Sequence, residues 1–275
     1  MKETLNKKNK KIVAITLVFF IIILFILTIM SAFNFFLFDP INLDWLLESP
    51  IAHRGLHENE IPENSLAAFT NAITYGYIIE LDVMLTKDNV PIIFHDKNTL
   101  RMTGEDYEVK DTNFTQLSSL KLDNSNEKIP TLEETLALVN KQVGLLIEIK
   151  STTKQNLNAI LTILESYDGN YALQFFNSLS CSWFSKKLPE IPVGMIYKDY
   201  KNIDAVPVLN LRDNICNLFI KPNFISYYYE YIEKMNLNKH REKGLIILGY
   251  TFTQSEITNP EYTNYFDNII FDLSN

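Results

Sequence analysis

The sequence has few cysteines and few basic residues for its length, and both shortages exclude classes of protein. Two cysteines, Cys181 and Cys216, among 275 residues cannot build the disulfide framework of a small secreted protein. They could pair in an oxidising compartment, but two buried free thiols are the simpler interpretation. Lys and Arg number 25 against 33 Asp and Glu, so the net charge is −8. A nucleic-acid partner, which needs a basic surface, is therefore not expected.

Internal repeats and low-complexity tracts are also lacking, which leaves an ordinary globular chain. Hydrophobic residues make up 47% of the sequence and aromatic residues 12%, enough to build a core, so general disorder is excluded. A chain of this length holds either one large domain or two domains of ordinary size.

Charge is absent from one long segment near the N-terminus. From Ile12 to Phe38 the sequence has no Asp, Glu, Lys or Arg, and about 20 apolar residues suffice to cross a bilayer as a helix. A cleaved signal peptide has a shorter apolar region and a better cleavage site than "MSAF", so we favour an uncleaved anchor. Lysines precede the segment and acidic residues follow it: Lys2, Lys7, Lys8, Lys10 and Lys11, then Asp39, Asp44 and Glu48.

This charge asymmetry predicts the topology and the domain boundaries. The positive-inside rule makes residues 1–11 a cytoplasmic basic tail and residues 12–38 a single transmembrane anchor. Residues 39–50 are then a polar linker, and residues 51–275 form one folded domain outside the cytoplasm. The predicted location is the cell membrane, with the N-terminus in the cytoplasm.

Short apolar runs alternate with helix-like segments after Pro50. Two of these segments, residues 64–76 and 131–141, have helical spacing, and in the second Thr131 and Glu134 predict a capping box. Strands that alternate with helices indicate parallel βα units, and eight strands fit an α/β fold of the (β/α)8 TIM-barrel type. The eight runs are "IAHRG", "IIELDV", "LLIEIK", "YALQFF", "PVGMIYK", "FISYYY", "ILGYTF" and "IIFDLS".

One further apolar run, Pro91–Asp96, follows the second strand too closely for a parallel crossover. A crossover needs a dozen or more residues, so this pair is predicted to be an antiparallel hairpin after strand two. If Asp88 and Asn89 form a two-residue turn, His95 lies directly across from Asp82. The hairpin then returns a histidine to the carboxylates of the second strand.

Polar residues gather at the carboxyl ends of the first strands, where barrel enzymes place their active sites. Glu80 and Asp82 share one face of a strand because side chains alternate, and Glu148 and Lys150 do so on the next parallel strand. Converging carboxylates repel each other unless a cation compensates them, and hard divalent cations prefer such oxygen ligands. The complete predicted group is His53, Arg54, Glu80, Asp82, His95, Glu148 and Lys150.

The residue types in this group suit displacement at a phosphodiester. Arg54 can form a forked contact with a phosphate, and Lys150 adds a point charge. His53 and His95 can act as general acid and base near neutral pH. A divalent cation, Ca²⁺ or Mg²⁺ with Mn²⁺ as a further candidate, completes the chemistry.

The motifs "AHRG", "PENS", "ELDVMLTKDNVPIIFHD", "IPTLEE" and "IEIK" resemble the glycerophosphodiester phosphodiesterase family. The resemblance is specific from Ile51 to Lys150 and fainter through "LQFFN" and "GYTFT". It implies a (β/α)8 barrel that hydrolyses glycerophosphodiesters to an alcohol and glycerol 3-phosphate. Attack by the substrate's own glycerol hydroxyl, through a cyclic phosphate, is one route proposed for the family.

The resemblance also assigns roles to residues. It implies an acid–base pair, His53 and His95, and a set of metal ligands, Glu80, Asp82 and Glu148. It implies phosphate contacts for Arg54 and Lys150. Glu63 and Asn64 of "PENS" match a signature that shapes the site, and Glu63 is grouped with the substrate-binding residues.

Departures from the family pattern fall in the second half of the chain. Tyr250-Thr251 stands where Trp-Thr is common, and the ending Phe271-Asp272-Leu273 lacks the proline of a "TD-x-P" motif. Several tyrosines in "ISYYYEYI" either line a substrate groove or pack at the barrel rim. These residues bear on the substrate, while the reaction type depends on the first half.

Two functions from other classes remain as alternatives. One is a catalytically inactive barrel that serves as a binding or scaffold module, and the other is a phospholipase C- or D-like enzyme acting on lysophospholipids. Because the anchor joins the barrel at the base of strand one, we expect soluble glycerophosphodiesters or polyglycerol phosphate as substrates. His57, in the loop after strand one, is predicted to be a surface residue.

Overall fold

The computed structural model describes residues 13–28, 41–58, 60–150, 154–197, 222–230, 241–242, 244–257, 259–260 and 264–273, without the side chains of residues 154–156. The chain divides into two compact units, Met1–Pro40 and Ile41–Asn275. In the first unit residues 13–28 are helical, and the rest of the predicted anchor lies outside the described residues. No helix in the described part of the chain combines the length and apolar character needed to cross a membrane.

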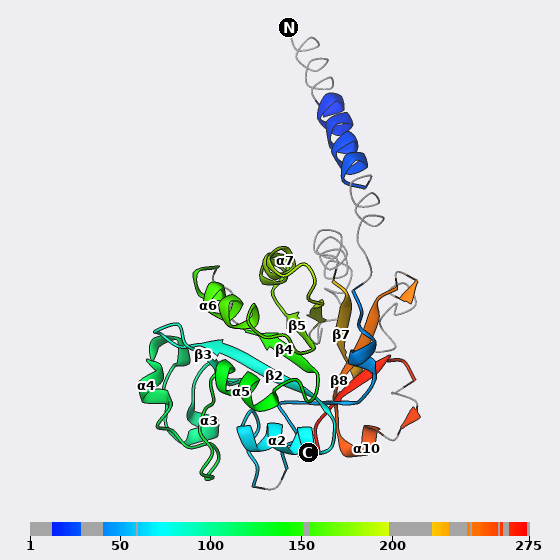
Figure 1. Ribbon diagram of the computed structural model, residues 1–275. Coiled ribbons are helices and arrows are strands. Elements are labelled where there is room, and N and C mark those ends of the chain that lie inside the picture. The colour runs from blue at the N-terminus through cyan, green and yellow to red at the C-terminus, as the bar shows by residue number, and fades with distance from the viewer. Residues whose placement is uncertain are drawn as a thin grey trace. The chain divides into compact units, whose positions relative to one another are not determined.

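The second unit is a closed barrel, as the sequence predicts (Figure 1). Eight parallel strands of the described residues follow the order β1-β9-β8-β7-β6-β5-β4-β2, and β1 pairs with both β9 and β2 to close the ring. All eight predicted runs contribute one strand each. Their bounds are β1 Ile51–Ala52, β2 Ile78–Leu85, β4 Leu145–Ile149, β5 Tyr171–Phe175, β6 Val193–Tyr197, β7 Phe224–Tyr228, β8 Ile246–Phe252 and β9 Asn268–Phe271.

The remaining strand, β3 (Pro91–Ile93), pairs antiparallel with β2, which confirms the hairpin. The predicted register is wrong by one residue, because Phe94, not His95, is bonded across from Asp82. The cause is a three-residue loop: the Thr86 N–H donates to the Val90 carbonyl, and Asn89 has a φ of 62°. Asparagine tolerates this left-handed conformation, which such longer hairpin loops require.

Helices cover the outside of the barrel, and the two predicted from spacing are present. Ser65 caps α2 by accepting a hydrogen bond from the Ala68 N–H, and Thr131 and Glu134 form the predicted capping box of α5. The helices are α2 Leu66–Thr74, α3 Leu100–Thr103, α4 Phe114–Leu117, α5 Leu132–Val139, α6 Lys154–Leu164, α7 Ser178–Lys187 and α10 Gln254–Ile257, with 3-10 turns η1 Asp44–Leu47 and η2 Val109–Asp111.

The segment between β3 and α5 has a small apolar core of its own. It contains α3, η2 and α4, and its buried residues include Phe94, Met102 and Leu117. Its position beside β3 matters for function, because the residues that directly follow β3 enter the site described below.

The base of the barrel is closed by residues that the sequence assigned to a linker. In η1, Leu46 is fully buried and packs with strand residues at the barrel base, among them Ile51 and Ile78. The ring of Trp45 lies where a Cβ on Gly144 would come within 2.5 Å of it. Residues from Ile41 onward thus belong to the same compact unit as the barrel, because the apolar base of the barrel would otherwise be exposed to water.

We expect Leu46→Ala to destabilise the barrel by about 2–5 kcal/mol, the cost typical of truncating a buried leucine. Leu47 is its matched control, since it is 41% exposed in the same turn, and Leu47→Ala should change stability by less than about 0.5 kcal/mol. Urea unfolding of both variants measures the difference. Equal, small effects would show that η1 does not belong to the barrel core.

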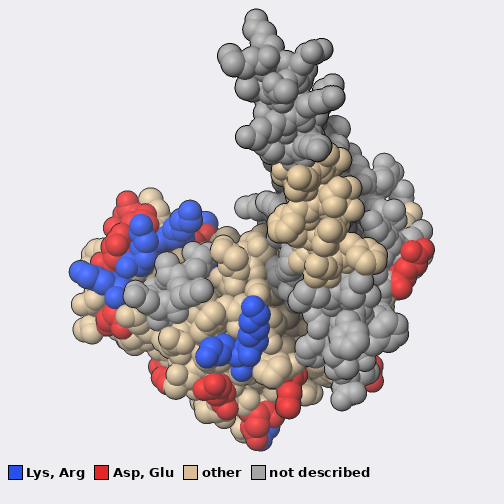
Figure 2. All heavy atoms as spheres, turned by 90° about the horizontal axis from the view of Figure 1, so that it is seen from above, with Lys and Arg blue, Asp and Glu red and all other residues tan. Residues whose placement is uncertain are grey.

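Charged side chains of both signs lie next to one another on the described residues of the face seen in Figure 2. The described residues of this face therefore carry no surface of a single charge sign.

Candidate active site

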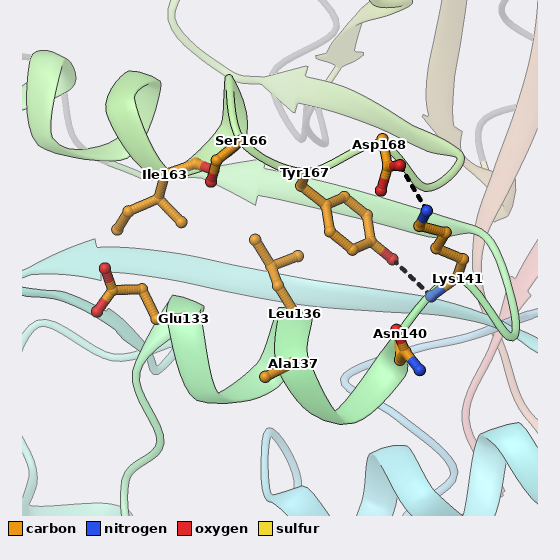
Figure 3. Close-up of a pocket in the computed structure, with 9 residues that line it drawn as sticks. All are labelled: Glu133, Leu136, Ala137, Asn140, Lys141, Ile163, Ser166, Tyr167 and Asp168. Atoms are coloured by element: carbon orange, nitrogen blue, oxygen red, sulfur yellow. Dashed lines mark hydrogen bonds and ion pairs between the residues drawn. The ribbon is translucent and has the colours of Figure 1, made fainter.

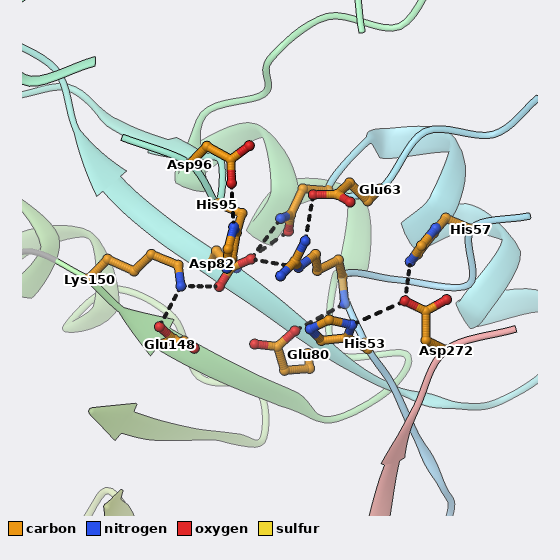
Figure 4. A network of polar contacts seen from close by, with 12 residues as sticks. His53, His57, Glu63, Glu80, Asp82, His95, Asp96, Glu148, Lys150 and Asp272 are labelled. Atoms are coloured by element: carbon orange, nitrogen blue, oxygen red, sulfur yellow. Dashed lines mark hydrogen bonds and ion pairs between the residues drawn. The ribbon is translucent and has the colours of Figure 1, made fainter. Parts of the chain in front are cut away.

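A cavity of about 720 Å³ opens at the carboxyl ends of the barrel strands. Its charged and imidazole side chains come from the ends of β1, β2 and β4 and from His95 and Asp96 after β3 (Figure 4). The structure thus brings together every site residue predicted from the sequence except Glu63, and their roles remain predictions. The predicted residues in the lining are His53, Arg54, Glu80, Asp82, His95, Glu148 and Lys150.

Three carboxylates form the floor of this cavity. Asp82 and Glu148 are register partners on neighbouring parallel strands, and Glu80 lies two residues before Asp82 on the same face. One oxygen from each lies within 4.8 Å of the others, although the residues are only 2%, 1% and 8% exposed in chain order. Sequence spacing alone predicted this convergence.

Burial and mutual repulsion shift the pKa values of two of these groups upward. Burial, followed by the charges of Asp82 and Glu148, raises the pKa of Glu80 well above its usual value. Burial and the charge of Asp82 likewise raise the pKa of Glu148 to about 7. The ionised forms of both carboxyl groups therefore cost free energy unless positive charge lies close to them.

Two cationic side chains compensate the third carboxylate. Burial alone would raise the pKa of Asp82, but Lys150 and Arg54 outweigh it and hold that pKa below its usual value. The Lys150 Nζ lies 3.0 Å from Asp82 Oδ1 and 2.6 Å from Glu148 Oε1. The Arg54 Nε lies 3.3 Å from Asp82 Oδ2.

The hydrogen bonds of Glu80 indicate whether the three carboxylates suit a divalent cation. Its hydrogen bonds come from neutral donors: the Arg54 main-chain N–H at 3.0 Å and the Gln174 amide at 3.5 Å. The neighbouring cations therefore leave the carboxylate cluster with uncompensated charge. An oxygen-only, buried and partly uncompensated set of three carboxylates fits a hard ion such as Ca²⁺ or Mg²⁺.

The turn after β1 places Arg54 against this cluster. Arg54 has a φ of 55°, which is uncommon for a residue with a side chain and directs its main-chain N–H to Glu80. Gly55 follows with a φ of 82°, and a Cβ there would lie 2.9 Å from atoms of Ala68 and Phe69 in α2. Glycine at position 55 of "HRG" is thus required both by its backbone conformation and by the approach of α2.

The "PENS" residues support the site from behind. Asn64 donates its side-chain amide to Asp82 Oδ2 at 2.9 Å, and Glu63 accepts from the Arg54 guanidinium at 2.7 Å. Glu63 also accepts two hydrogen bonds from Arg101, and it is not part of the cavity lining. Glu63 therefore contacts Arg54, the residue predicted to bind phosphate, and does not itself line the cavity.

Each of the two histidines faces a carboxylate through Nδ1. His53 Nδ1 lies 3.3 Å from Asp272 Oδ2, and His95 Nδ1 lies 2.6 Å from Asp96 Oδ1 (Figure 4). Burial lowers the pKa of both imidazoles, so the neutral form is favoured. A neutral imidazole that donates through Nδ1 keeps Nε2 available as a base.

Sequence reasoning missed two residues of this network. Asp272 was treated as part of a departure from the family ending, although its place after the last strand was a usable signal. His57 was predicted to be a surface residue, and this is wrong: it is 8% exposed, with Nε2 3.4 Å from Asp272. Its burial depends on the closure of β1 against β9, which local spacing does not reveal.

We expect Asp272→Asn to lower kcat by roughly 10–10²-fold, the range found where a carboxylate orients a functional histidine. The carboxylate raises the pKa of His53 against the effect of burial, so its removal lowers that pKa further. The limb of the pH–rate profile that belongs to His53 should therefore move to lower pH. A reduced rate with an unmoved profile would assign Asp272 a purely structural role.

The rest of the cavity wall is mostly apolar and aromatic. It is formed by β5 to β9, which complete the ring beyond the charged strands. Of the tyrosines whose role the sequence left open, Tyr228 lines the cavity together with Tyr250, whereas Tyr227 and Tyr229 are buried in the core. Tyr231 lies outside the described residues.

A second, smaller cavity of about 310 Å³ lies in the outer helix layer between α5 and the end of α6 (Figure 3). Its polar contacts include a hydrogen bond from the Lys141 N–H to the Tyr167 hydroxyl and an ion pair between the exposed side chains of Lys141 and Asp168. It lacks the converging carboxylates and imidazoles of the first cavity, so we assign the chemistry to the strand ends.

Comparison with known proteins agrees with this geometry. Residues 53–268 match the Glycerophosphoryl diester phosphodiesterase family. The chain is 30% identical to YhdW of Bacillus subtilis, covering 73% of this chain and 84% of that protein. It is 34% identical to the glycerophosphodiester phosphodiesterase of Caldanaerobacter subterraneus, covering 54% of this chain and 66% of that protein.

Solved structures share the barrel. A phosphodiesterase of Oleispira antarctica, in complex with the product sn-glycerol-3-phosphate, superposes with a TM-score of 0.69 at 23% identity. The match covers 82% of this chain and 94% of that one. At this identity the likeness establishes the fold.

Proposed function

Since the chain belongs to the glycerophosphoryl diester phosphodiesterase family, we propose that it hydrolyses glycerophosphodiesters to an alcohol and glycerol 3-phosphate with a divalent cation. The observation that carries the proposal is the cavity in which two imidazoles, each facing a carboxylate, flank a buried cluster of three carboxylates. The acid–base and ligand positions that the family resemblance implies all carry residues of the expected type, which argues against an inactive scaffold.

The cation would be held by Glu80, Asp82 and Glu148, where it would supply positive charge beside a bound phosphate. Arg54 and Lys150 bring two further charges to the same place, so both non-bridging phosphate oxygens can be neutralised. Lys150 contacts two of the carboxylates and would move its ammonium towards the phosphate when the cation compensates them.

His53 and His95 divide the proton transfers. One imidazole takes the proton of the attacking hydroxyl as a bond to phosphorus forms, and the other protonates the leaving alkoxide as the phosphorus–oxygen bond breaks. The attacking hydroxyl belongs either to water or to the glycerol of the substrate, in which case a cyclic phosphate is hydrolysed in a second step. Asp272 and Asp96 each stabilise the imidazolium that forms beside them.

The uncharged arc of the cavity suits the leaving alcohol. The charged residues occupy β1, β2 and β4 and the turn after β3, while Phe176, Tyr228 and Tyr250 lie on the arc that begins at β5. A diester bound with its phosphate at the cations would extend its alcohol along these aromatic side chains.

Product identification on a panel of glycerophosphodiesters, lysophospholipids and polyglycerol phosphate tests the proposal. Glycerol 3-phosphate and free alcohol are expected, with Ca²⁺, Mg²⁺ and Mn²⁺ compared as the added ion. A phosphorylated head group or a persistent cyclic phosphate would instead indicate a phospholipase C- or D-like enzyme. Absence of hydrolysis on the whole panel would favour the scaffold function.

Membrane anchoring by residues 12–38, with the barrel outside the cytoplasm, is a second part of the proposal. It is supported by the absence of charge in this segment and by the exposure of its large apolar side chains between Val13 and Ile26. Alkaline extraction of membranes should leave the full-length chain in the pellet, and added protease should reach the barrel on intact cells. Release by alkali, or protection of the barrel in intact cells, would overturn anchoring or topology respectively.

A further inference from the structure

A second set of metal-ligand types lies on the far side of His53 from the carboxylate cluster. His53 Nδ1 and His57 Nε2 lie 3.3 Å and 3.4 Å from the same atom, Asp272 Oδ2. The three ligand atoms all lie within 4.8 Å of one another. Two imidazoles and one carboxylate, from the turn after β1 and the end of β9, thus converge on a point (Figure 4).

Hydrogen bonding accounts for the contact of His53 with Asp272 but not for that of His57. The His57 side chain is 9% exposed, and its buried Nε2 has no hydrogen-bond partner among the described residues. Good N–H···O bonds to a carboxylate measure about 2.7–2.9 Å, and the 2.6 Å contact of His95 with Asp96 shows that this chain forms short ones. A buried nitrogen without a partner is costly and calls for an explanation.

The distances do fit a bound metal ion. With bonds of about 2.0–2.1 Å and tetrahedral angles, two ligands of a zinc ion lie about 3.3 Å apart. Both histidine–aspartate distances, 3.3 Å and 3.4 Å, have this value already. The remaining histidine–histidine edge is at most 4.8 Å, so a shift of about 1.5 Å or less completes the face of the tetrahedron.

We propose that His53, His57 and Asp272 form a binding site for Zn²⁺, separate from the carboxylate site of Glu80, Asp82 and Glu148. The two sites differ in the chemistry of their donors. Two imidazole nitrogens and one oxygen favour zinc and similar transition ions, whereas three carboxylates favour Ca²⁺ or Mg²⁺. One coordination position stays open for solvent.

Occupancy of this site has a consequence for the neighbouring cavity. His53 lines that cavity and would be tied to the ion through Nδ1. The remaining proton of the neutral imidazole would then lie on Nε2, so the ring could neither accept a proton there nor turn freely. Zinc therefore suppresses hydrolysis without competing with Ca²⁺ or Mg²⁺. This consequence rests on the proposed function, whereas the binding itself does not.

Calorimetric titration of the chelator-stripped, full-length protein with ZnCl₂, in excess Mg²⁺, tests the site. One zinc ion per chain is expected, and X-ray absorption should report imidazole scattering. His57→Gln keeps an amide near the position of Nε2 but removes the ligand, and it should weaken the zinc Kd by at least about tenfold. His95→Gln and Glu80→Gln, which alter the neighbouring cavity, should leave the zinc Kd unchanged.

Two results would overturn the site. One is an unchanged zinc affinity in His57→Gln. The other is loss of zinc binding in Glu80→Gln, together with an X-ray absorption spectrum of the natural protein that shows only oxygen ligands around the zinc. In hydrolysis assays, the rate of His57→Gln, measured relative to its own zinc-free rate, should no longer fall when zinc is added. If no substrate is hydrolysed, the proposed function fails while the zinc titration still decides the site. Zinc binding that leaves the rate of an active enzyme unchanged would overturn the suppression.

Discussion

Replacing His53 or His95 by alanine should lower kcat by about 10²–10⁴-fold, the contribution typical of a general acid or base. The imidazoles contact carboxylates and line the cavity, but the three carboxylates of the floor do not depend on them for position. The fold and the affinity for Ca²⁺ or Mg²⁺ should therefore persist in both variants. Steady-state kinetics with calorimetry of the same samples measures both quantities.

The double variant distinguishes a shared role from two independent ones. If the two histidines act in one proton-transfer sequence, removing the second costs little once the first is gone, because such groups are not additive. His53→Ala/His95→Ala should then be close to the slower single variant. Losses that multiply would contradict the acid–base pair.

Replacing a floor carboxylate by its amide should abolish most activity and weaken binding of the divalent cation. Glu80→Gln, Asp82→Asn and Glu148→Gln each remove one charged oxygen ligand with little change of shape. Glu133→Gln is a matched control, since Glu133 is exposed on α5 and lies outside the active-site cavity. Unchanged cation affinity in all three floor variants would show that the metal site is wrongly assigned.

The stability of the floor variants distinguishes a carboxylate that serves as a metal ligand from one that stabilises the fold. Burial and like charges raise the pKa of Glu80, so this carboxyl group lowers stability as pH rises above its ordinary pKa, and the full cost is reached above the raised one. In the presence of chelator, Glu80→Gln should therefore be at least as stable as the natural protein while it loses activity. Asp82→Asn should be less stable, because it removes the buried carboxylate that Lys150 and Arg54 share and leaves each cation with one carboxylate partner.

The barrel and most of the site were predictable because both depend on periodic patterns. Alternation along β2 and β4 places Glu80, Asp82 and Glu148 on one face, and parallel strands bring their ends together. The capping box at Thr131 and the hairpin after β2 are equally local signals. Family resemblance added the roles of these residues, which periodicity cannot supply.

The errors concern contacts that no local pattern encodes. Asp272 meets His53 and His57 because β1 pairs with β9 when the barrel closes, across almost the whole domain. Leu46 is buried because it covers apolar strand residues at the base of the barrel, although the polar residues around it in sequence are typical of a linker. The predicted hairpin register was wrong by one residue because the sequence did not distinguish a two-residue loop from the three-residue loop that forms.

Phosphorus NMR of a soluble glycerophosphodiester with the full-length protein tests the central claim most directly. With Ca²⁺ or Mg²⁺ present, the diester signal should disappear as the signal of glycerol 3-phosphate grows in equal amount. Chelator should stop the conversion, and restored cation should resume it. Conversion at the same rate in chelator, or appearance of a phosphorylated alcohol in place of glycerol 3-phosphate, would contradict the account.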